Sequence, residues 1–323
     1  TWIILISATA VSIFPYLLDS AFTYRTGFPL DDSWIHQTYA RNLALRGEWS
    51  FLPGQLSGGS TAPLWSALLA IGFKLGLSPF IWTFFLGGLC LFLLALSTEA
   101  GMRKIFKEYQ GKIPWVGLLI IFEWHLVWAS VSGMETILLA LIAFILVFSL
   151  IRKPTSWLLL GVLAGISVWV RPDGVTLIGP IIFVALFSQP TWKLRTRLVC
   201  YVLFGFAIFF LPYLLFNLTL AGTPFPTTFY AKQAEYSSWQ ARPIFERMGE
   251  VAILFPGVII TTGWAIRNKA WGMVSAILWM TGYVGIYLLR LPAYQHGRYL
   301  MPVMPEYLLI GYFGYLQFLL SKK

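Results

Sequence analysis

The stretch Asp31–Trp65 reads DDSWIHQTYARNLALRGEWSFLPGQLSGGSTAPLW and is the longest weakly apolar segment of the chain. It follows one apolar run of membrane-spanning length and precedes many more. Ionisable residues beside a bilayer are costly to keep, so they mark candidate functional sites. The adjacent Asp31 and Asp32 therefore mark a candidate functional site. The apolar runs around them indicate the fold class.

The composition is that of an integral membrane protein. Of the 323 residues, 58% are hydrophobic and only 11% are charged, whereas soluble domains carry about 25% charged residues. The mean hydropathy is +0.73. Because the apolar runs continue to the C-terminus, a single signal peptide cannot account for them. The sequence predicts an all-α polytopic membrane protein.

About ten segments have the apolar character and approximate length that a membrane-spanning helix needs. The candidate spans are residues 2–18, 79–97, 113–131, 134–151, 157–170, 174–189, 198–219, 249–266, 271–289 and 299–320. Two further segments, 33–46 and 63–76, are predicted to be helices that lie at the membrane interface. The first carries an imperfect apolar stripe of Trp34, Ile35, Tyr39, Leu43 and Leu45. We expect one membrane domain over residues 1–323, with residues 19–78 as its first extracytoplasmic loop.

The net charge of +10 does not indicate a nucleic-acid partner, because the basic residues lie in short clusters between apolar runs. The clusters are Arg103, Lys104, Lys107 and Lys112; Arg152 and Lys153; Lys193, Arg195 and Arg197; Arg267 and Lys269; Lys322 and Lys323. The positive-inside rule assigns these loops to the cytoplasmic side. A span at 63–76 would move the 101–112 loop outside and break this pattern. We expect a cytoplasmic (inner) membrane protein with its acidic loops, including Asp31 and Asp32, on the extracytoplasmic face.

Three acidic residues are the candidate catalytic groups. Asp31 and Asp32 precede a helical segment, where one aspartate suffices as an N-cap. The second aspartate is not needed for capping and is available as a general base or a metal ligand. Glu135 lies at the outer start of a helix, where it either complements the helix dipole or takes a catalytic or substrate-orienting role.

Arg171, Lys232 and Arg298 are cations at outer helix ends. Such side chains either reach toward lipid headgroups or clamp the oxygens of a phosphate. His36 follows Asp32 by four residues, so the two can share a helix face.

A divalent metal site involving Asp31, Asp32, His36 and Glu135 stays open, with His296 as a second histidine, although no CxxC or HExxH spacing is present. Glu123 and His125 fall near the middle of a predicted span and are interpreted as a structural hydrogen-bonded group between helices.

Six motifs, taken in order, resemble the polytopic GT-C glycosyltransferases that use polyprenyl-phosphate sugars. The motifs are DDSWIHQTYARNLALRG from Asp31, STAPLW from Ser60, SGMET from Ser132, RPDG from Arg171, FYAK from Phe229 and GRYLMPVMP from Gly297. The resemblance is closest to the bacterial terminal arabinofuranosyltransferase branch. The protein O-mannosyltransferases and the aminoarabinose transferases are more distant.

The resemblance implies a helical bundle with interfacial helices in its first extracytoplasmic loop. It also implies that the family's acidic motif maps onto Asp31 and Asp32, and that the acidic residue of the second such loop maps onto Glu135. Some relatives bind a divalent metal. The wall arabinosyltransferases usually carry a large extracytoplasmic C-terminal domain that this sequence does not contain, which weakens the expectation of a polymeric arabinan acceptor.

The function that follows is transfer of a sugar from a polyprenyl-phosphate donor to a hydroxyl of a glycan, lipid or protein acceptor. The transfer would invert the anomeric centre, with Asp31 or Asp32 as the general base, and Arg171, Lys232 and Arg298 would hold the donor phosphate. Two alternatives stay open: a lipid or solute transporter, and a non-catalytic GT-C-like subunit that binds a lipid-linked sugar. A transporter would favour ionisable residues at mid-membrane, whereas here the acidic residues gather on one face.

Overall fold

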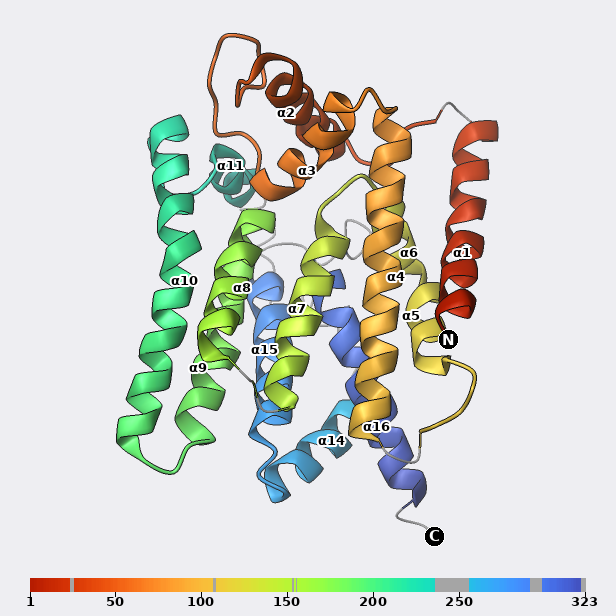
Figure 1. Ribbon diagram of the computed structural model, residues 1–323, viewed down its shortest axis with the longest axis vertical. Helices are drawn as coiled ribbons and strands as arrows, with labels where there is room; N and C mark the ends of the chain where they lie inside the picture. The colour runs from red at the N-terminus through yellow and green to blue at the C-terminus, as the bar shows by residue number, and fades with distance from the viewer. Residues whose placement is uncertain are drawn as a thin grey trace.

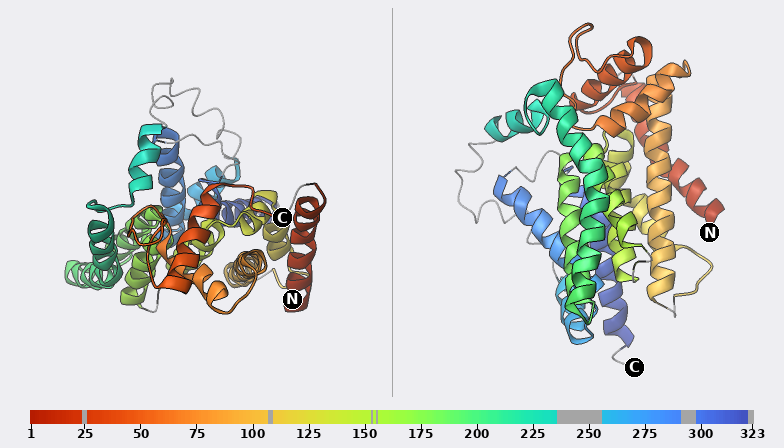
Figure 2. Two further views of the ribbon diagram at one scale, coloured as in Figure 1. Left: turned by 90° about the horizontal axis from the view of Figure 1, so that it is seen from above. Right: turned by 60° about the vertical axis from the view of Figure 1, so that its left-hand side comes forward.

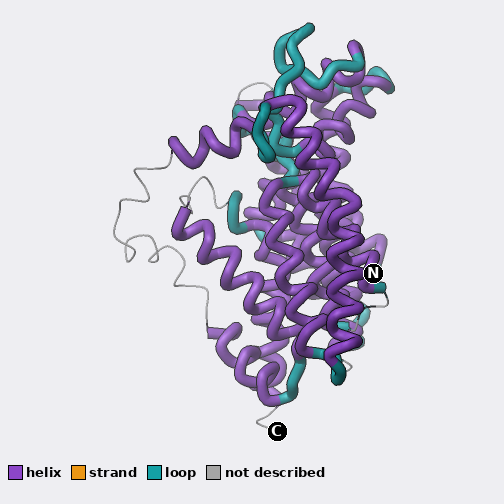
Figure 3. Tube along the Cα trace, turned by 90° about the vertical axis from the view of Figure 1, so that its left-hand side faces the viewer, coloured by secondary structure: helices purple, strands orange, loops and turns teal. Residues whose placement is uncertain are grey.

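The computed structural model describes residues 1–23, 26–106, 109–152, 154, 156–235, 256–290 and 298–320, which form one bundle of helices (Figure 1, Figure 2). Within these residues, three helices are long and apolar enough to cross a membrane: α1 (Trp2–Thr23), α4 (Pro79–Ile105) and α10 (Trp192–Ala221). Figure 3 shows most of the described chain as helix, with its most extended loops gathered at one end. The all-α membrane class is confirmed, and the number of about ten spans stays a prediction.

The remaining predicted spans correspond to shorter helices. These are α5 (Trp115–Phe122), α6 (Trp124–Val131), α7 (Thr136–Ile151), α8 (Trp157–Val170), the 3-10 turn η1 (Pro172–Leu177) with α9 (Ile178–Phe187), α14 (Pro256–Arg267), α15 (Trp271–Arg290), and the turn η3 (Met301–Val303) with α16 (Met304–Leu320). The first residues of the predicted span 249–266 lie outside the described residues.

The span predicted over 113–131 is broken at Glu123, between α5 and α6. Glu123 leaves the helical conformation with φ −71° and ψ 113°, and its carboxylate accepts a hydrogen bond from the backbone N–H of Leu126 at 2.9 Å. Its other oxygen lies 2.6 Å from Nδ1 of His125. The Glu123–His125 pair therefore lies within one helix break and caps α6, instead of joining two helices.

One end of the bundle is crossed by α2 (Asp32–Arg46) and α3 (Pro63–Lys74), with α11 (Thr227–Glu235) beside them; we call this the α2 end (Figure 1, Figure 2). The helices α2 and α3 occur where the sequence predicts two interfacial helices, and their place at the membrane interface stays a prediction. Pro63 begins α3. At this position a backbone N–H would have no partner within the helix, so proline, which lacks one, is well tolerated. Gly47, at φ 70°, ends α2 in the left-handed conformation that glycine adopts readily.

The buried face of α2 is mainly polar, which differs from the predicted apolar stripe. Within that stripe Tyr39 is buried, but Trp34 and Leu45 are 46% and 68% exposed. Ser33 donates to the carbonyl of Ser132 at 2.6 Å, and other polar side chains of this face are bonded similarly. Because buried polar groups need such partners, α2 is fixed in one orientation on the bundle, and that orientation positions Asp32 and His36.

Close packing of α8 against α10 fixes the position of the loop that carries Arg171. A Cβ at Gly161 would lie 2.2 Å from the carbonyl oxygen of Val202, and one at Gly205 would lie 2.4 Å from that of Leu158. Small residues allow helix backbones in membranes to approach this closely. Since α8 ends at Val170, Arg171 emerges from a rigid helix pair.

Candidate functional site

A cavity of about 620 Å³ opens at the α2 end of the bundle; we call it the site cavity. Its lining contains all three cations that the sequence predicts for a phosphate clamp, Arg171, Lys232 and Arg298, together with Glu135. Aromatic and aliphatic side chains, among them Phe229, form much of the remaining wall. A concave apolar site with a few convergent polar groups is the usual form of a ligand pocket.

Asp32 is held by two of the cations. Its Oδ2 atom accepts a hydrogen bond from Nζ of Lys232 and another from Nη2 of Arg298, both at 2.8 Å. Burial raises the pKa of Asp32, but the charges and hydrogen bonds of Lys232 and then Arg298 outweigh burial and lower that pKa to about 2. Asp32 is therefore an anionic anchor for the two cations.

Asp31 takes the capping position at the start of α2. Its Oδ1 atom accepts a hydrogen bond from the backbone N–H of Asp32 at 2.9 Å, and its side chain is exposed. Among the ion pairs that the described residues form, none involves Asp31. The two adjacent aspartates thus have different surroundings, one open to solvent and one fixed between cations.

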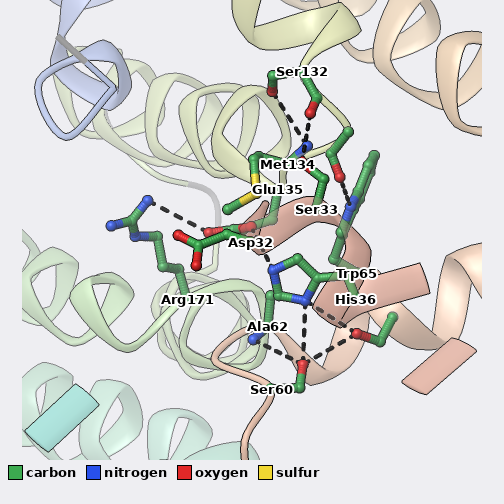
Figure 4. A network of polar contacts seen from close by, with 12 residues as sticks. Asp32, Ser33, His36, Ser60, Ala62, Trp65, Ser132, Met134, Glu135 and Arg171 are labelled. Carbon is green, nitrogen blue, oxygen red and sulfur yellow. Dashed lines mark hydrogen bonds and ion pairs between the residues drawn. The ribbon is translucent and has the colours of Figure 1, made fainter. Parts of the chain in front are cut away.

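Glu135, at the start of α7, lies between His36 and Arg171 (Figure 4). Nε2 of His36 is 3.3 Å from Oε2 of Glu135, which is within ion-pair range but is not aligned as a hydrogen bond. Nη1 of Arg171 donates to Oε1 at 3.4 Å. Burial raises the pKa of Glu135, but His36 and then Arg171 reverse this and lower it to about 2. Glu135 is only 1% exposed, so it is a buried carboxylate kept anionic by its two neighbours.

The His36 ring is oriented by hydroxyl groups on its far side. Nδ1 lies 3.3 Å from Oγ of Ser60 and 3.3 Å from Oγ of Ser66 (Figure 4). The ring is therefore held between Glu135 on one side and the two serine hydroxyls on the other. Through His36 and Asp32, α2 thus contacts three residues that line the site cavity: Glu135, Lys232 and Arg298.

Arg171 also binds a cluster that the sequence analysis did not assign. Its Nε atom donates to Oδ2 of Asp173 at 2.6 Å. The same oxygen accepts from the hydroxyl of Tyr283 at 3.3 Å and, in a very short contact, from that of Tyr287. Both tyrosines come from α15, four residues apart and hence on one helix face. That spacing was the available signal, but tyrosines in an apolar helix are equally typical of a buried core.

Two guanidinium groups lie within cation–π range of the Tyr299 ring. The Cζ atom of Arg171 is 5.0 Å from its centroid and that of Arg298 is 4.9 Å from it, both in cation–π range. Arg298 also donates to the Tyr299 hydroxyl at 3.0 Å. Tyr299 therefore contacts both guanidinium groups at the wall of the site cavity and favours their positive charge there.

The arrangement does not fit a divalent metal at Asp31, Asp32 and His36. Asp32 is engaged by Lys232 and Arg298, while His36 is engaged by serine hydroxyls and Glu135. Among the described residues no three His, Cys, Asp or Glu side chains gather as a metal site would require. His296, the second histidine considered, lies outside the described residues.

Comparison with known proteins gives a likeness of fold. No family model and no curated protein sequence matches the chain. Among solved structures, ArnT from Cupriavidus metallidurans bound to undecaprenyl phosphate is similar, with a TM-score of 0.64 and 16% sequence identity. The match covers 96% of this chain and 59% of the ArnT chain, so this chain spans about three fifths of the length of ArnT. The chain therefore has an ArnT-like fold, as the resemblance to GT-C glycosyltransferases implied.

Proposed function

We propose that the protein is a membrane glycosyltransferase that moves a sugar from a polyprenyl-phosphate donor to an acceptor hydroxyl on the extracytoplasmic face. One observation carries the proposal: Arg171, Lys232 and Arg298, distant in sequence, line one largely apolar cavity together with Glu135. A phosphate attached to a polyprenyl chain needs such a combination, since its charge requires cations and its chain requires apolar walls. The ArnT-like fold is consistent with this assignment, because the ArnT structure was obtained with undecaprenyl phosphate.

In the proposed reaction the acceptor hydroxyl oxygen attacks the anomeric carbon of the donor sugar. The bond between that carbon and the phosphate oxygen breaks, and the polyprenyl phosphate leaves with the electron pair. The hydroxyl proton passes to an aspartate carboxylate. A single displacement inverts the anomeric centre. The cations bind the leaving phosphate and stabilise its developing charge.

We assign the base to Asp31 and an orienting role to Asp32. A carboxylate whose pKa is lowered to about 2 is a weak base, and Asp32 is committed to Lys232 and Arg298. Asp31 is exposed beside it and is free of ion pairs with the described residues. Glu135 then orients Arg171 toward the phosphate, which the 3.4 Å contact between them supports.

The finer identity rests on the sequence resemblance, which favours the terminal arabinofuranosyltransferase branch. The proposed acceptor is a glycan, lipid or protein hydroxyl in the cell envelope. The proposed orientation has the α2 end outside and the basic loops in the cytoplasm, as the positive-inside rule predicts.

The test is transfer of label from a panel of polyprenyl-phosphate sugars by purified protein in detergent, beside Asp31→Asn and Asp32→Asn. We expect Asp31→Asn to lower turnover by at least about 10²-fold while donor binding is retained, because general-base catalysis supplies about 10²- to 10⁴-fold. Asp32→Asn should weaken donor binding as well, since it releases both cations.

Asp19→Asn is the matched control, because Asp19 is an acidic residue of α1 whose carboxylate accepts only a local hydrogen bond from Thr23 among the bonds described here. It should keep wild-type turnover. Donor binding by the wild type without turnover on any acceptor would contradict the proposal. It would favour the transporter or the non-catalytic subunit.

A further inference from the structure

The opposite end of the bundle holds a second cavity, of about 750 Å³, which we call the far cavity. It lies among the last residues of α4, α7 and α9 and the first residues of α8 and α15, at the end away from α2 and α3 (Figure 1). Among the residues that the structure describes, three cations line it: Lys104, Arg152 and Lys269. They come from three of the basic clusters that the sequence analysis interpreted only as topology signals.

Close contact between α7 and α15 brings two of these cations together. A Cβ on Gly272 would lie 2.3 Å from the carbonyl oxygen of Leu150, so only glycine allows α15 to begin against the end of α7. Arg152 follows the last residue of α7, and Lys269 precedes α15 in a tight turn with φ 51°. A non-glycine residue rarely adopts that conformation, so the turn defines where the Lys269 side chain leaves the backbone.

The three cations have no anionic partner in the described part of the chain. None of the ion pairs formed by the described residues includes Lys104, Arg152 or Lys269. The lining of the far cavity contains no aspartate or glutamate among the residues described. All three cations are exposed, so each is hydrated and available to an incoming anion. Three positive charges around one concave space favour an anionic ligand.

Aromatic rings give this cavity the character of a membrane interface. Trp157, Trp264 and Trp271 line it beside the cations, and Ser188 adds a hydroxyl. Tryptophan is enriched at the level of lipid headgroups, where its ring contacts acyl chains and its N–H reaches polar groups. A lining that combines cations with indole rings matches a ligand with a phosphate head and an apolar tail more closely than it matches a small soluble anion.

We propose that the far cavity binds the phosphate of an anionic membrane lipid headgroup, on the membrane face opposite the site cavity. Lys104, Arg152 and Lys269 contact the phosphate, and the three tryptophans contact the glycerol and the first carbons of the acyl chains. Basic pockets between helices on the cytoplasmic side are suited to such headgroups. The binding does not depend on sugar transfer, because no residue of the far cavity lines the site cavity.

The test measures binding of phosphatidylglycerol and of phosphatidylcholine to the full-length protein in detergent, by native mass spectrometry. The variant Arg152→Gln/Lys269→Gln is compared with Lys193→Gln/Arg197→Gln, which removes the same charge from the start of α10 outside the cavity. We expect saturable binding of one phosphatidylglycerol that is preferred over phosphatidylcholine. The cavity variant should weaken it by about tenfold or more, and the matched control should leave it within about twofold.

Competition by inorganic phosphate provides a second test of the proposal. If free phosphate competes with phosphatidylglycerol only at concentrations far above those of the lipid, the apolar part of the ligand contributes and the lipid assignment stands. If phosphate alone saturates the same residues as tightly, the cavity is a site for a soluble anion and the lipid assignment is wrong. Equal phosphatidylglycerol binding by the cavity variant and the wild type would also overturn the proposal. The melting temperature of each variant in detergent checks that it is folded.

Discussion

In the described part of the chain, three cations line the site cavity and three line the far cavity, but the two sets have different partners. In the site cavity Arg171, Lys232 and Arg298 all contact carboxylates. In the far cavity the cations are exposed and form no ion pair with the described residues. The first set is fixed in direction by Asp32, Glu135 and Asp173, whereas the second remains hydrated.

The difference follows from the cost of burying charge. A guanidinium that leaves water must find an anion or hydrogen-bond acceptors, and each partner also fixes its geometry. Arg298 is 3% exposed and Arg171 is 8% exposed, so the carboxylates must compensate the cost of burying both charges. Fixed direction is what catalysis on a phosphate leaving group requires. Recognition of a lipid headgroup tolerates mobile, hydrated cations.

The largest expected contrast is between Arg171→Met and Arg152→Met. The first leaves Glu135 and Asp173 without their cation in a buried site, and loss of one partner of a buried pair costs about 3–5 kcal/mol. The second removes an exposed cation and should stay within about 0.5 kcal/mol of the wild type. Unfolding of the two variants in detergent, followed by circular dichroism, measures the difference.

Arg171→Met/Glu135→Gln serves as the check on this explanation. If the cost arises from an unpaired carboxylate, neutralising that carboxylate should recover part of the lost stability. An Arg171→Met protein as stable as Arg152→Met would show that the site cavity does not depend on charge compensation.

The next largest difference is expected in how stability depends on pH. Of the two cavities, only the site cavity has carboxylates among its described lining residues. The pKa of Glu135 is lowered from its usual 4.5 to about 2, and that of Asp32 from 3.8 to about 2. Groups with a lowered folded-state pKa stabilise the protein above their unfolded pKa. That stability is lost as the pH falls from about 4.5 toward about 2.

We expect Glu135→Gln to flatten the loss of stability between pH 5 and pH 2, by on the order of 2–3 kcal/mol. The more exposed Asp32 should contribute less, and Lys269→Gln should keep the wild-type profile. Melting temperatures across this pH range give the comparison. A Glu135→Gln profile identical to the wild type would mean that the buried pairs do not stabilise the fold.

The sequence predicted the fold well because helix boundaries are local. The helices expected over 33–46 and 63–76 occur as α2 and α3, with glycine at the end of α2 and proline at the start of α3. The break at Glu123 was not predicted, since the apolar run continues through it and the carboxylate caps α6 only once that helix has started. Which face of α2 is buried also depended on distant partners such as Ser132.

The site was predictable in part, because residues at the ends of helices can be recognised from local sequence. Cations and carboxylates at outer helix ends were recognisable as candidates, and Arg171, Lys232 and Arg298 line one cavity. The different surroundings of Asp31 and Asp32 were not predictable. They depend on Lys232 and Arg298, which lie 200 and 266 residues beyond Asp32 along the chain. The far cavity was also missed, because clusters interpreted as topology signals converge only in the folded bundle.

A smaller effect is expected from substitution of Gly272, which lines the far cavity where α15 packs against α7. Gly272→Ala would place a methyl group 2.3 Å from the carbonyl of Leu150, and overpacking of this kind costs about 1–3 kcal/mol. In the same helix α15, a methyl group on Gly282 would meet no neighbouring segment within 4 Å, so Gly282→Ala should leave stability unchanged or slightly raised. Unfolding in detergent compares the two. Equal effects would mean that α7 and α15 do not need this close approach.

The smallest expected effect concerns the Tyr299 ring, which contacts the guanidinium groups of Arg171 and Arg298 in the site cavity. Tyr299→Leu removes two cation–π contacts and should weaken polyprenyl-phosphate binding by about five- to thirtyfold, whereas Tyr299→Phe keeps the ring and loses only the hydroxyl that accepts from Arg298. Phenylalanine should therefore cost about two- to fivefold. Trp271→Leu, in the far cavity, should not change this affinity.

Equilibrium binding of a labelled short-chain polyprenyl phosphate ranks the three variants. Equal affinities of Tyr299→Phe and Tyr299→Leu would assign the ring no role. The positions of the cations would then depend on the carboxylates alone, and fixed direction rather than aromatic contact would distinguish the site cavity from the far cavity.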